Sequence, residues 1–254
     1  MSDSLAWREA LQSSLGAATQ QLVSRIVVLD ATASTQDECR RLAEGRPGCL
    51  VTARRQTAGR GRLGRHWADD RGQGAALTLS VAAQTPERLS IASAVAVCEG
   101  LEPFAGGQLG LRWPNDIIAD GRKLAGILIE QLDLIALIGV GVNVNQTDWP
   151  TELAGIAISL RQLIGTEVDR IDVIAQLIQG LGVNLARSDD EISDAFARRD
   201  LLTGTMQTFT IGHERITGIV ERIDPLTGIL VRTNDGARAL PTSATSLVKP
   251  HPHS

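Results

Sequence analysis

The stretch RWPNDIIADGRKLAGILIE, from Arg112 to Glu130, predicts a hairpin in the middle of the chain. The letters WPND end one strand with a tight turn, and GRK returns the chain into an apolar strand that carries Lys123 near its start. Because a hairpin brings the two sides of its turn together, we expect Asn115, Asp116 and Lys123 to lie close together at one edge of a sheet.

Lysine is scarce in this chain. Lys123 and Lys249 are the only two lysines among 25 cationic residues. Where arginine is the default cation, a retained lysine indicates a need for a compact point charge. An ordinary exposed hairpin lysine is the alternative interpretation of Lys123.

The segments around this hairpin read as alternating strands and helices. Residues 134–144 are apolar almost throughout, which predicts a strand buried on both faces. Thr85 and Pro86 mark the start of a helix, and Ser34 or Thr35 caps another. Residues 1–22 read as a short helix or a loose arm. The full set of expected strands is 25–30, 49–54, 75–82, 109–113, 123–131 and 134–144, and the expected helices are 34–45, 85–101 and one or two within 170–200.

The pattern changes after residue 203. Between residues 204 and 248, short alternating segments are separated by the turn signals DPLTG at Asp224 and NDG at Asn234. We therefore expect two units, 1–203 and 204–254, with a hinge near the letters RRDLLTG. The second unit is expected to form a small five-stranded barrel.

The stretch QTAGRGRLGRHW, from Gln56 to Trp67, combines three glycines with three arginines. Glycine lets a backbone approach a ligand closely, and arginine holds carboxylates and phosphates. The stretch therefore predicts a loop that folds over an anionic small molecule. It also matches the dinucleotide pattern GxGxxG, but no strand runs directly into it and no helix starts within it. A solvated basic loop is the plainer alternative, although it does not explain the spacing of the glycines.

Two further stretches place polar residues beside expected elements. Asn143 follows the buried strand, where Gly139 and Gly141 would let a ligand or another chain pack closely. A plain strand end is the alternative. The letters STQD at Ser34 fit a helix cap, and they can also supply hydroxyl and amide groups to a polar ligand.

The composition limits the function classes. With 254 residues, 43% of them apolar, the chain can bury a sizeable core. A net charge of −4 gives no global basic field for DNA, and the apolar runs are too short to cross a membrane. The N-terminus lacks a secretory pattern, and Cys39, Cys49 and Cys98 lack CxxC spacing, so a reduced cytoplasmic setting is expected. The four histidines do not cluster, so no metal ligands are predicted.

Several of these stretches together resemble the biotin protein ligase family, also called biotin–[acetyl-CoA carboxylase] ligases. STQD, QTAGRGRLGRHW, RWPNDI, GRKLAGILIE and GVGVNVN occur in the family's order over roughly residues 25–165. The resemblance implies an α+β fold, in which a mixed sheet flanked by helices, like that of class II aminoacyl-tRNA synthetases, precedes an SH3-like barrel. It also implies an enzyme that joins biotin to ATP with Mg²⁺, forming biotinyl-5′-AMP. The biotinyl group then passes to one lysine of the biotin carboxyl carrier protein domain of acetyl-CoA carboxylase.

The resemblance also implies roles for individual residues. Lys123 would lie beside the biotin carboxylate and the ATP α-phosphate, Arg62 would belong to the closing loop, and Asp116 would face the carrier lysine. Trp149 is a candidate to cover the adenine. The full set of expected biotin and nucleotide contacts is Ser34, Thr35, Gln36, Gln56, Gly59, Arg60, Gly61, Arg62, Arg65, Trp67, Trp113, Asn115, Lys123, Gly126 and Asn143.

Two other classes of protein stay open at this point. A lipoate ligase shares the architecture and the adenylation chemistry, but its expected glycine-rich motif with a following HD pair is not found. A nucleic-acid module built on the arginine loop conflicts with the net charge of −4 and with only three Phe and four Trp for base stacking. About two dozen residues precede the first strand, so we expect neither a DNA-binding winged helix nor specific DNA binding.

Overall fold

A seven-stranded mixed sheet forms the centre of the molecule. The structure is a computed structural model that describes residues 3–64, 66–67, 69 and 71–248. The sheet has the strand order β1-β2-β5-β9-β8-β7-β6, in which β1 and β2 are parallel and the other neighbours are antiparallel. Its strands are β1 (Arg25–Leu29), β2 (Cys49–Ala53), β5 (Ala75–Ala82), β6 (Gly110–Arg112), β7 (Asp116–Ala119), β8 (Arg122–Leu132) and β9 (Ile135–Val142).

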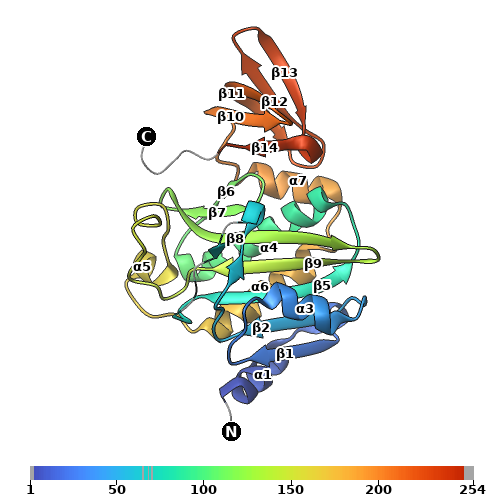
Figure 1. Cartoon of the computed structure of the whole chain (residues 1–254), viewed down its shortest axis with the longest axis vertical. Helices are drawn as coiled ribbons and strands as arrows, with labels where there is room; N and C mark the ends of the chain where they lie inside the picture. The colour runs from blue at the N-terminus through green and yellow to red at the C-terminus, as the bar shows by residue number, and fades with distance from the viewer. Residues whose placement is uncertain (1–2, 65, 68, 70, 249–254) are drawn as a thin grey trace.

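Helices cover both faces of this sheet, which confirms the expected α+β class (Figure 1). On one face, α3 (Thr35–Ala43) packs against β2, β5 and β9. On the other face, α4 (Pro86–Ala105) packs against β7 and β8, and α6 (Arg170–Asn184) packs against α4 and β5. The remaining helices are α1 (Asp3–Ser14), α2 (Ala17–Leu22), α5 (Leu160–Ile164) and α7 (Asp189–Ala197).

Local capping explains where two of these helices begin. The Ser34 hydroxyl accepts a hydrogen bond from the backbone N–H of Gln36, so the chain turns into α3 at Thr35. Pro86 occupies the first turn of α4, where its missing N–H costs nothing. Both starts agree with the sequence-based expectation, and α4 continues four residues beyond the expected end at residue 101, to Ala105.

The hairpin from Arg112 to Glu130 contains one strand more than expected. β7 pairs antiparallel with both β6 and β8, so this segment forms two consecutive hairpins where one was expected. This four-residue strand, with the sequence DIIA, is fully buried and carries no period-two alternation that would identify it. The short helix α5 was also not predicted.

The C-terminal part forms a second sheet of five antiparallel strands, as many as expected. They are β10 (Met206–Ile211), β11 (Glu214–Asp224), β12 (Gly228–Thr233), β13 (Gly236–Pro241) and β14 (Thr245–Leu247). The order β13-β12-β11-β10-β14 leaves β13 and β14 at opposite edges, so the expected closed barrel is not formed within the described residues. The three-residue β14 pairs with β10 alone and β13 pairs with β12 alone, so one edge of each strand is left without a partner strand among the described residues.

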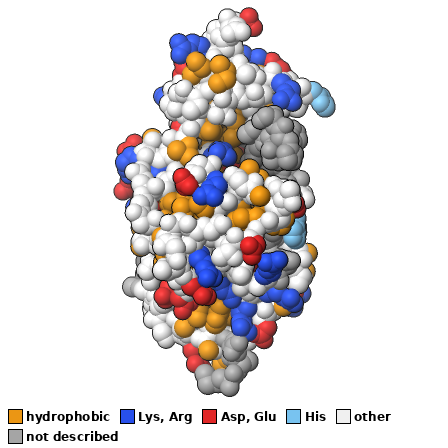
Figure 2. All heavy atoms as spheres, turned by 90° about the vertical axis from the view of Figure 1, so that its left-hand side faces the viewer, with side chains coloured by type: hydrophobic (Ala, Val, Ile, Leu, Met, Phe, Trp, Pro, Cys, Tyr) orange, Lys and Arg blue, Asp and Glu red, His pale blue; other side chains and the backbone are white. Residues whose placement is uncertain are grey.

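The face of the molecule in Figure 2 shows no single dominant charge. On the face in Figure 2, cationic, anionic and apolar side chains are interspersed. Among the described residues, none of the helices combines the length and the apolarity needed to cross a bilayer.

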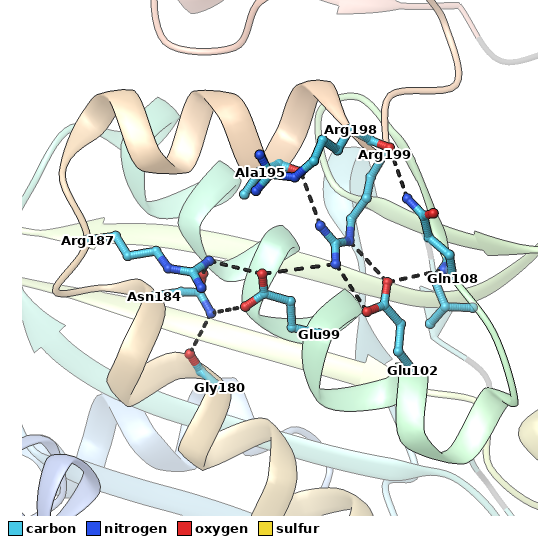
Figure 3. A network of polar contacts seen from close by, with 10 residues as sticks. Glu99, Glu102, Gln108, Gly180, Asn184, Arg187, Ala195, Arg198 and Arg199 are labelled. Carbon is cyan, nitrogen blue, oxygen red and sulfur yellow. Dashed lines mark hydrogen bonds and ion pairs between the residues drawn. The ribbon is translucent and has the colours of Figure 1, made fainter.

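A network of ion pairs joins the helices behind the sheet to the start of the C-terminal part (Figure 3). Arg199, whose side chain is only 10% exposed, contacts Glu102 at 3.1 Å and Glu99 at 4.0 Å. Arg187 contacts Glu99 at 3.0 Å. Because Glu99 and Glu102 belong to α4 while both arginines follow α6, the network fixes α4 against the helices that lead into the second sheet.

Residues 199–201 form backbone hydrogen bonds with β6, the edge strand of the first sheet. Leu111 in β6 donates its N–H to Arg199 O (2.7 Å) and accepts from Leu201 N (3.0 Å). The rings of Trp113 and Phe209 meet edge to face, with centroids 6.5 Å apart. The two sheets therefore share one continuous apolar core through these rings.

Candidate active site

A pocket opens on the α3 face of the central sheet, above β5, β8 and β9. It gathers side chains from segments that lie far apart in the sequence. The expected contact residues that line it are Ser34, Thr35, Gln36, Gln56, Arg60, Gly61, Arg62, Trp67, Asn115, Lys123 and Gly126.

One end of the pocket is a buried cluster of amides and hydroxyls. Gln56 Oε1 accepts hydrogen bonds from Thr35 N (2.8 Å) and Thr35 Oγ1 (3.1 Å). The hydroxyl of Thr78 in β5 donates to Gln36 Oε1 (3.2 Å). Gln36 is only 3% exposed, yet its Nε2 has no hydrogen-bond partner within the described part of the chain. A buried donor of this kind favours a ligand that brings an acceptor.

The floor of the pocket requires glycine. Gly126 in β8 pairs with Gly141 in β9, and the Trp67 indole lies over both. A Cβ atom added at Gly141 would lie 2.5 Å from Trp67 Cε2, and one added at Gly126 would lie 3.2 Å from Trp67 Cζ3. At Gly139, a Cβ atom would collide with Gln36 Oε1. These glycines hold open the space between the sheet and the side chains above it.

The other end of the pocket is cationic. Lys123 Nζ lies 2.7 Å from Asp116 Oδ1 and 5.3 Å from the centroid of the Trp67 ring. Arg62 Nη1 donates to Asn115 Oδ1 (3.4 Å). Burial lowers the pKa of the Arg62 guanidinium, and the Asp116 carboxylate nearby acts in the opposite direction. Both cations therefore interact electrostatically with one buried carboxylate, Asp116.

An irregularity in β8 explains how Lys123 reaches the pocket. The register between β7 and β8 shifts between Ile117 and Ile118, which are paired with Ala125 and Lys123. Lys123, Gly126 and Leu128 all line the pocket, although strict alternation would turn Lys123 to the opposite face. The bulge thus redirects the lysine toward the same side as the glycine floor.

Comparison with known proteins fits this geometry. The model of the Biotin/lipoate A/B protein ligase family matches residues 26–145. A biotin–[acetyl-CoA-carboxylase] ligase of Paracoccus denitrificans is 30% identical over 236 residues, which cover 85% of this chain and 98% of that protein. The chain belongs to the biotin protein ligase family.

Two further relatives place the chain within this family. The structure of a biotin protein ligase from Aquifex aeolicus in complex with biotin and ATP superposes with a TM-score of 0.81 at 26% identity, covering 89% of this chain and 100% of that one. The bifunctional ligase/repressor BirA of Bacillus subtilis is 39% identical over 176 residues, which cover 64% of this chain. The chain spans about half the length of that relative, 54%.

The arginine loop, residues 56–67, forms a small hairpin beside the pocket. Its two arms are β3 (Gly59–Arg60) and β4 (His66–Trp67), which pair antiparallel, and a 3-10 turn spans Arg62–Gly64. A Cβ atom on Gly59 would lie 2.8 Å from the carbonyl oxygen of Trp67, so glycine is needed for the arms to approach. The expected contact residue Arg65 lies outside the described residues.

Five residues suggested by the sequence do not line this pocket. Asp116 is buried beside Lys123, which does line it. Gly59 lies behind Trp67, and Trp113 packs against Phe209 in the shared core. Asn143 is buried at the end of β9 and donates to the Lys123 carbonyl (3.2 Å). Trp149, the candidate adenine cover, donates its indole N–H to Gln162 Oε1 (3.0 Å).

Thr78 and Leu128 also line the pocket, although neither was predicted from the sequence. Thr78, Gly139 and Leu128 lie side by side on β5, β9 and β8. A single threonine in the middle of the apolar letters AALTLSVA was the available signal for Thr78. Leu128 gave no signal, because an apolar residue in an apolar strand reads as core.

Proposed function

We propose that this protein activates biotin as biotinyl-5′-AMP and transfers the biotinyl group to a lysine of a biotin carboxyl carrier protein. The observation that carries this proposal is the polarity of the pocket. Buried amides and hydroxyls around Gln36 and Gln56 occupy one end, and Lys123 and Arg62 occupy the other. A neutral ureido ring suits the first end, and the biotin carboxylate with the ATP α-phosphate suits the second.

The first half-reaction joins two anions, so charge neutralisation is the main requirement. A carboxylate oxygen of biotin attacks the α-phosphorus of ATP, the bond to the β-phosphate oxygen breaks, and pyrophosphate leaves. Lys123 and Arg62 stabilise the charge on the α-phosphate as this exchange proceeds. The polar end holds the biotin ring, so that the carboxylate is aimed at the phosphorus and the encounter becomes intramolecular.

The second half-reaction needs a neutral amine. The carrier lysine nitrogen attacks the carbonyl carbon of biotinyl-AMP, the bond to the phosphate oxygen breaks, and AMP leaves. Asp116, which is 2% exposed, lies at the cationic end and accepts the proton that the amine loses. Its contact with Lys123 holds the carboxylate in place at this end of the pocket.

Mg²⁺ would reach the site bound to the phosphates of ATP. The described residues contain no group of three or more His, Cys, Asp or Glu side chains that could hold a metal ion. Mg²⁺ commonly binds through substrate phosphates and water with only one or two carboxylates, so the pocket is compatible with a MgATP complex.

Residues 1–203 would form the catalytic unit, and residues 204–254 a smaller unit beside it. The described cysteines are free thiols, which supports a reducing cytoplasmic location. A nucleic-acid module is less well supported, because Arg60 is paired with two carboxylates and Arg62 is half-buried.

Thermal unfolding with added ligands tests the proposal. A ligand that binds only the folded state raises the unfolding temperature in proportion to the logarithm of its concentration. Biotin should stabilise the protein, and biotin with MgATP should stabilise it further as the adenylate forms. Equal or greater stabilisation by lipoate, the other substrate class of the matched family model, would redirect the assignment to a lipoate ligase. Stabilisation by an oligonucleotide alone would support a nucleic-acid module.

A further inference from the structure

We propose that Glu130 is a positioning residue that fixes the arginine arm, residues 59–62, against the pocket. This inference rests on the proposed function. Glu130 closes the motif GRKLAGILIE, and its carboxylate meets the Arg60 guanidinium, with Nη2 lying 3.2 Å from Oε1 and 3.3 Å from Oε2. The arm is therefore held by a strand of the sheet as well as by its own hairpin.

The position of Glu130 on β8 makes this contact possible. Gly126 and Leu128 line the pocket, and Glu130 follows at the next alternate position, so all three project from the same face. Its side chain is 21% exposed, which limits screening by solvent. Arg40 of α3 also contacts Glu130, at 2.9 Å, and holds the carboxylate from the helix side.

A second carboxylate completes the cradle around Arg60. Asp37 Oδ1 of α3 lies 2.8 Å from the same Nη2 atom, but its side chain is 55% exposed. The more exposed pair contributes less, since solvent and salt weaken it. With two carboxylates beside it, Arg60 acts mainly as an anchor for the arm. Lys123 and Arg62 are then the cations that would meet the α-phosphate of ATP in the proposed function.

The anchor acts on the pocket through the hairpin. Arg60 pairs with His66, and Gly59 pairs with Trp67, so a fixed Arg60 also fixes the strand that carries the indole. That indole covers Gly126 and Gly141 beside Lys123. Loss of the Glu130 contact should therefore loosen the wall of the pocket and speed ligand release, while leaving the reacting groups of the filled site in place.

The test compares Glu130→Gln, which keeps the shape and removes the charge, with Glu38→Gln. Glu38 is a matched control because it pairs with Arg41 at 2.8 Å on α3 without touching the arm. In the ligand-free protein, trypsin should cut after Arg60 and Arg62 about fivefold faster in Glu130→Gln than in wild type. High salt should narrow this difference, and Glu38→Gln should match wild type.

The second readout uses biotin and separates binding from chemistry. Glu130→Gln should release biotin about fivefold faster and raise its KM, with kcat at saturation within about twofold of wild type. Glu130→Asp should recover part of the loss. Unchanged trypsin cutting and unchanged biotin release in Glu130→Gln would overturn the inference. If wild type itself binds no biotin, the proposed function fails, while the trypsin comparison still decides the role of Glu130.

Discussion

Lys123 Nζ lies 2.7 Å from Asp116 Oδ1, in a contact where the carboxylate is buried and the lysine side chain is 31% exposed. The two residues that the proposal assigns to different half-reactions thus form one ion pair. This arrangement couples the steps, because a change in either partner alters the electrostatics of the other. It also explains why the chain retains a lysine here among so many arginines, since a compact ammonium can meet Asp116 while it faces the pocket.

Lys123→Ala should abolish most adenylate synthesis while the protein stays folded. Removing a charge-assisted contact made in the transition state costs roughly 2–4 kcal/mol, or about 30- to 1000-fold in rate. Pyrophosphate release in a single turnover measures the effect, and circular dichroism checks the fold. A folded variant with normal pyrophosphate release would show that Lys123 has no part in the chemistry.

Asp116→Asn should slow both half-reactions, but unequally. The first step should slow by about tenfold, because Lys123 loses the ion pair that orients its ammonium group. The second step should slow by about 100-fold or more, because no carboxylate remains to take the proton from the carrier amine. Preformed biotinyl-AMP added to the variant isolates the second step. Equal losses in the two steps would assign Asp116 to the support of Lys123 alone.

Gly139→Ala should weaken biotin binding, because the new methyl group would collide with the Gln36 side chain at the polar end of the pocket. We expect the KM for biotin to rise by about tenfold or more. Gly107→Ala is the matched control, since a Cβ atom there meets nothing within 4 Å. If both variants bind biotin as well as wild type, the ligand does not occupy the space beside Gly139.

Glu99→Gln should destabilise the protein in a pH-dependent manner. Burial alone would raise the pKa of Glu99, but hydrogen bonds from Asn184 and Arg187 outweigh it, so the pKa lies below its ordinary value. A lowered pKa stabilises the folded state above the ordinary carboxyl pKa, and this stabilisation disappears as the pH falls through the lowered value. Unfolding temperatures measured at neutral pH and between about pH 5 and pH 2 test this. The exposed Glu152→Gln is the control, and a difference between wild type and Glu99→Gln that does not shrink in acid would contradict it.

Much of the fold could be predicted because local signals were strong. The buried run in β9, the cap at Ser34 and the Thr85–Pro86 start each fix an element without help from distant residues. β7 could not be found in this way, because four buried residues between two turns resemble any apolar segment. The prediction of a closed barrel was wrong, because the number of strands does not determine whether the two edge strands pair.

The candidate site shows the same division. The motifs that contain Gln36, Gln56 and Lys123 supply residues that the structure gathers in one pocket. The contact between Arg60 and Glu130 joins residues 70 positions apart, so only the folded chain reveals it. The bulge that turns Lys123 toward the pocket is also a property of the pairing between β7 and β8, which the sequence does not display.

The most direct test of the account is transfer of labelled biotin to a carrier domain. The full chain is incubated with labelled biotin, MgATP and a biotin carboxyl carrier protein domain, and label on the carrier is measured after denaturation. The account predicts covalent label on a single carrier lysine, dependent on ATP, with one pyrophosphate released for each biotinyl group transferred. A carrier that remains unlabelled, under conditions in which the wild-type chain is folded and binds biotin, would contradict it.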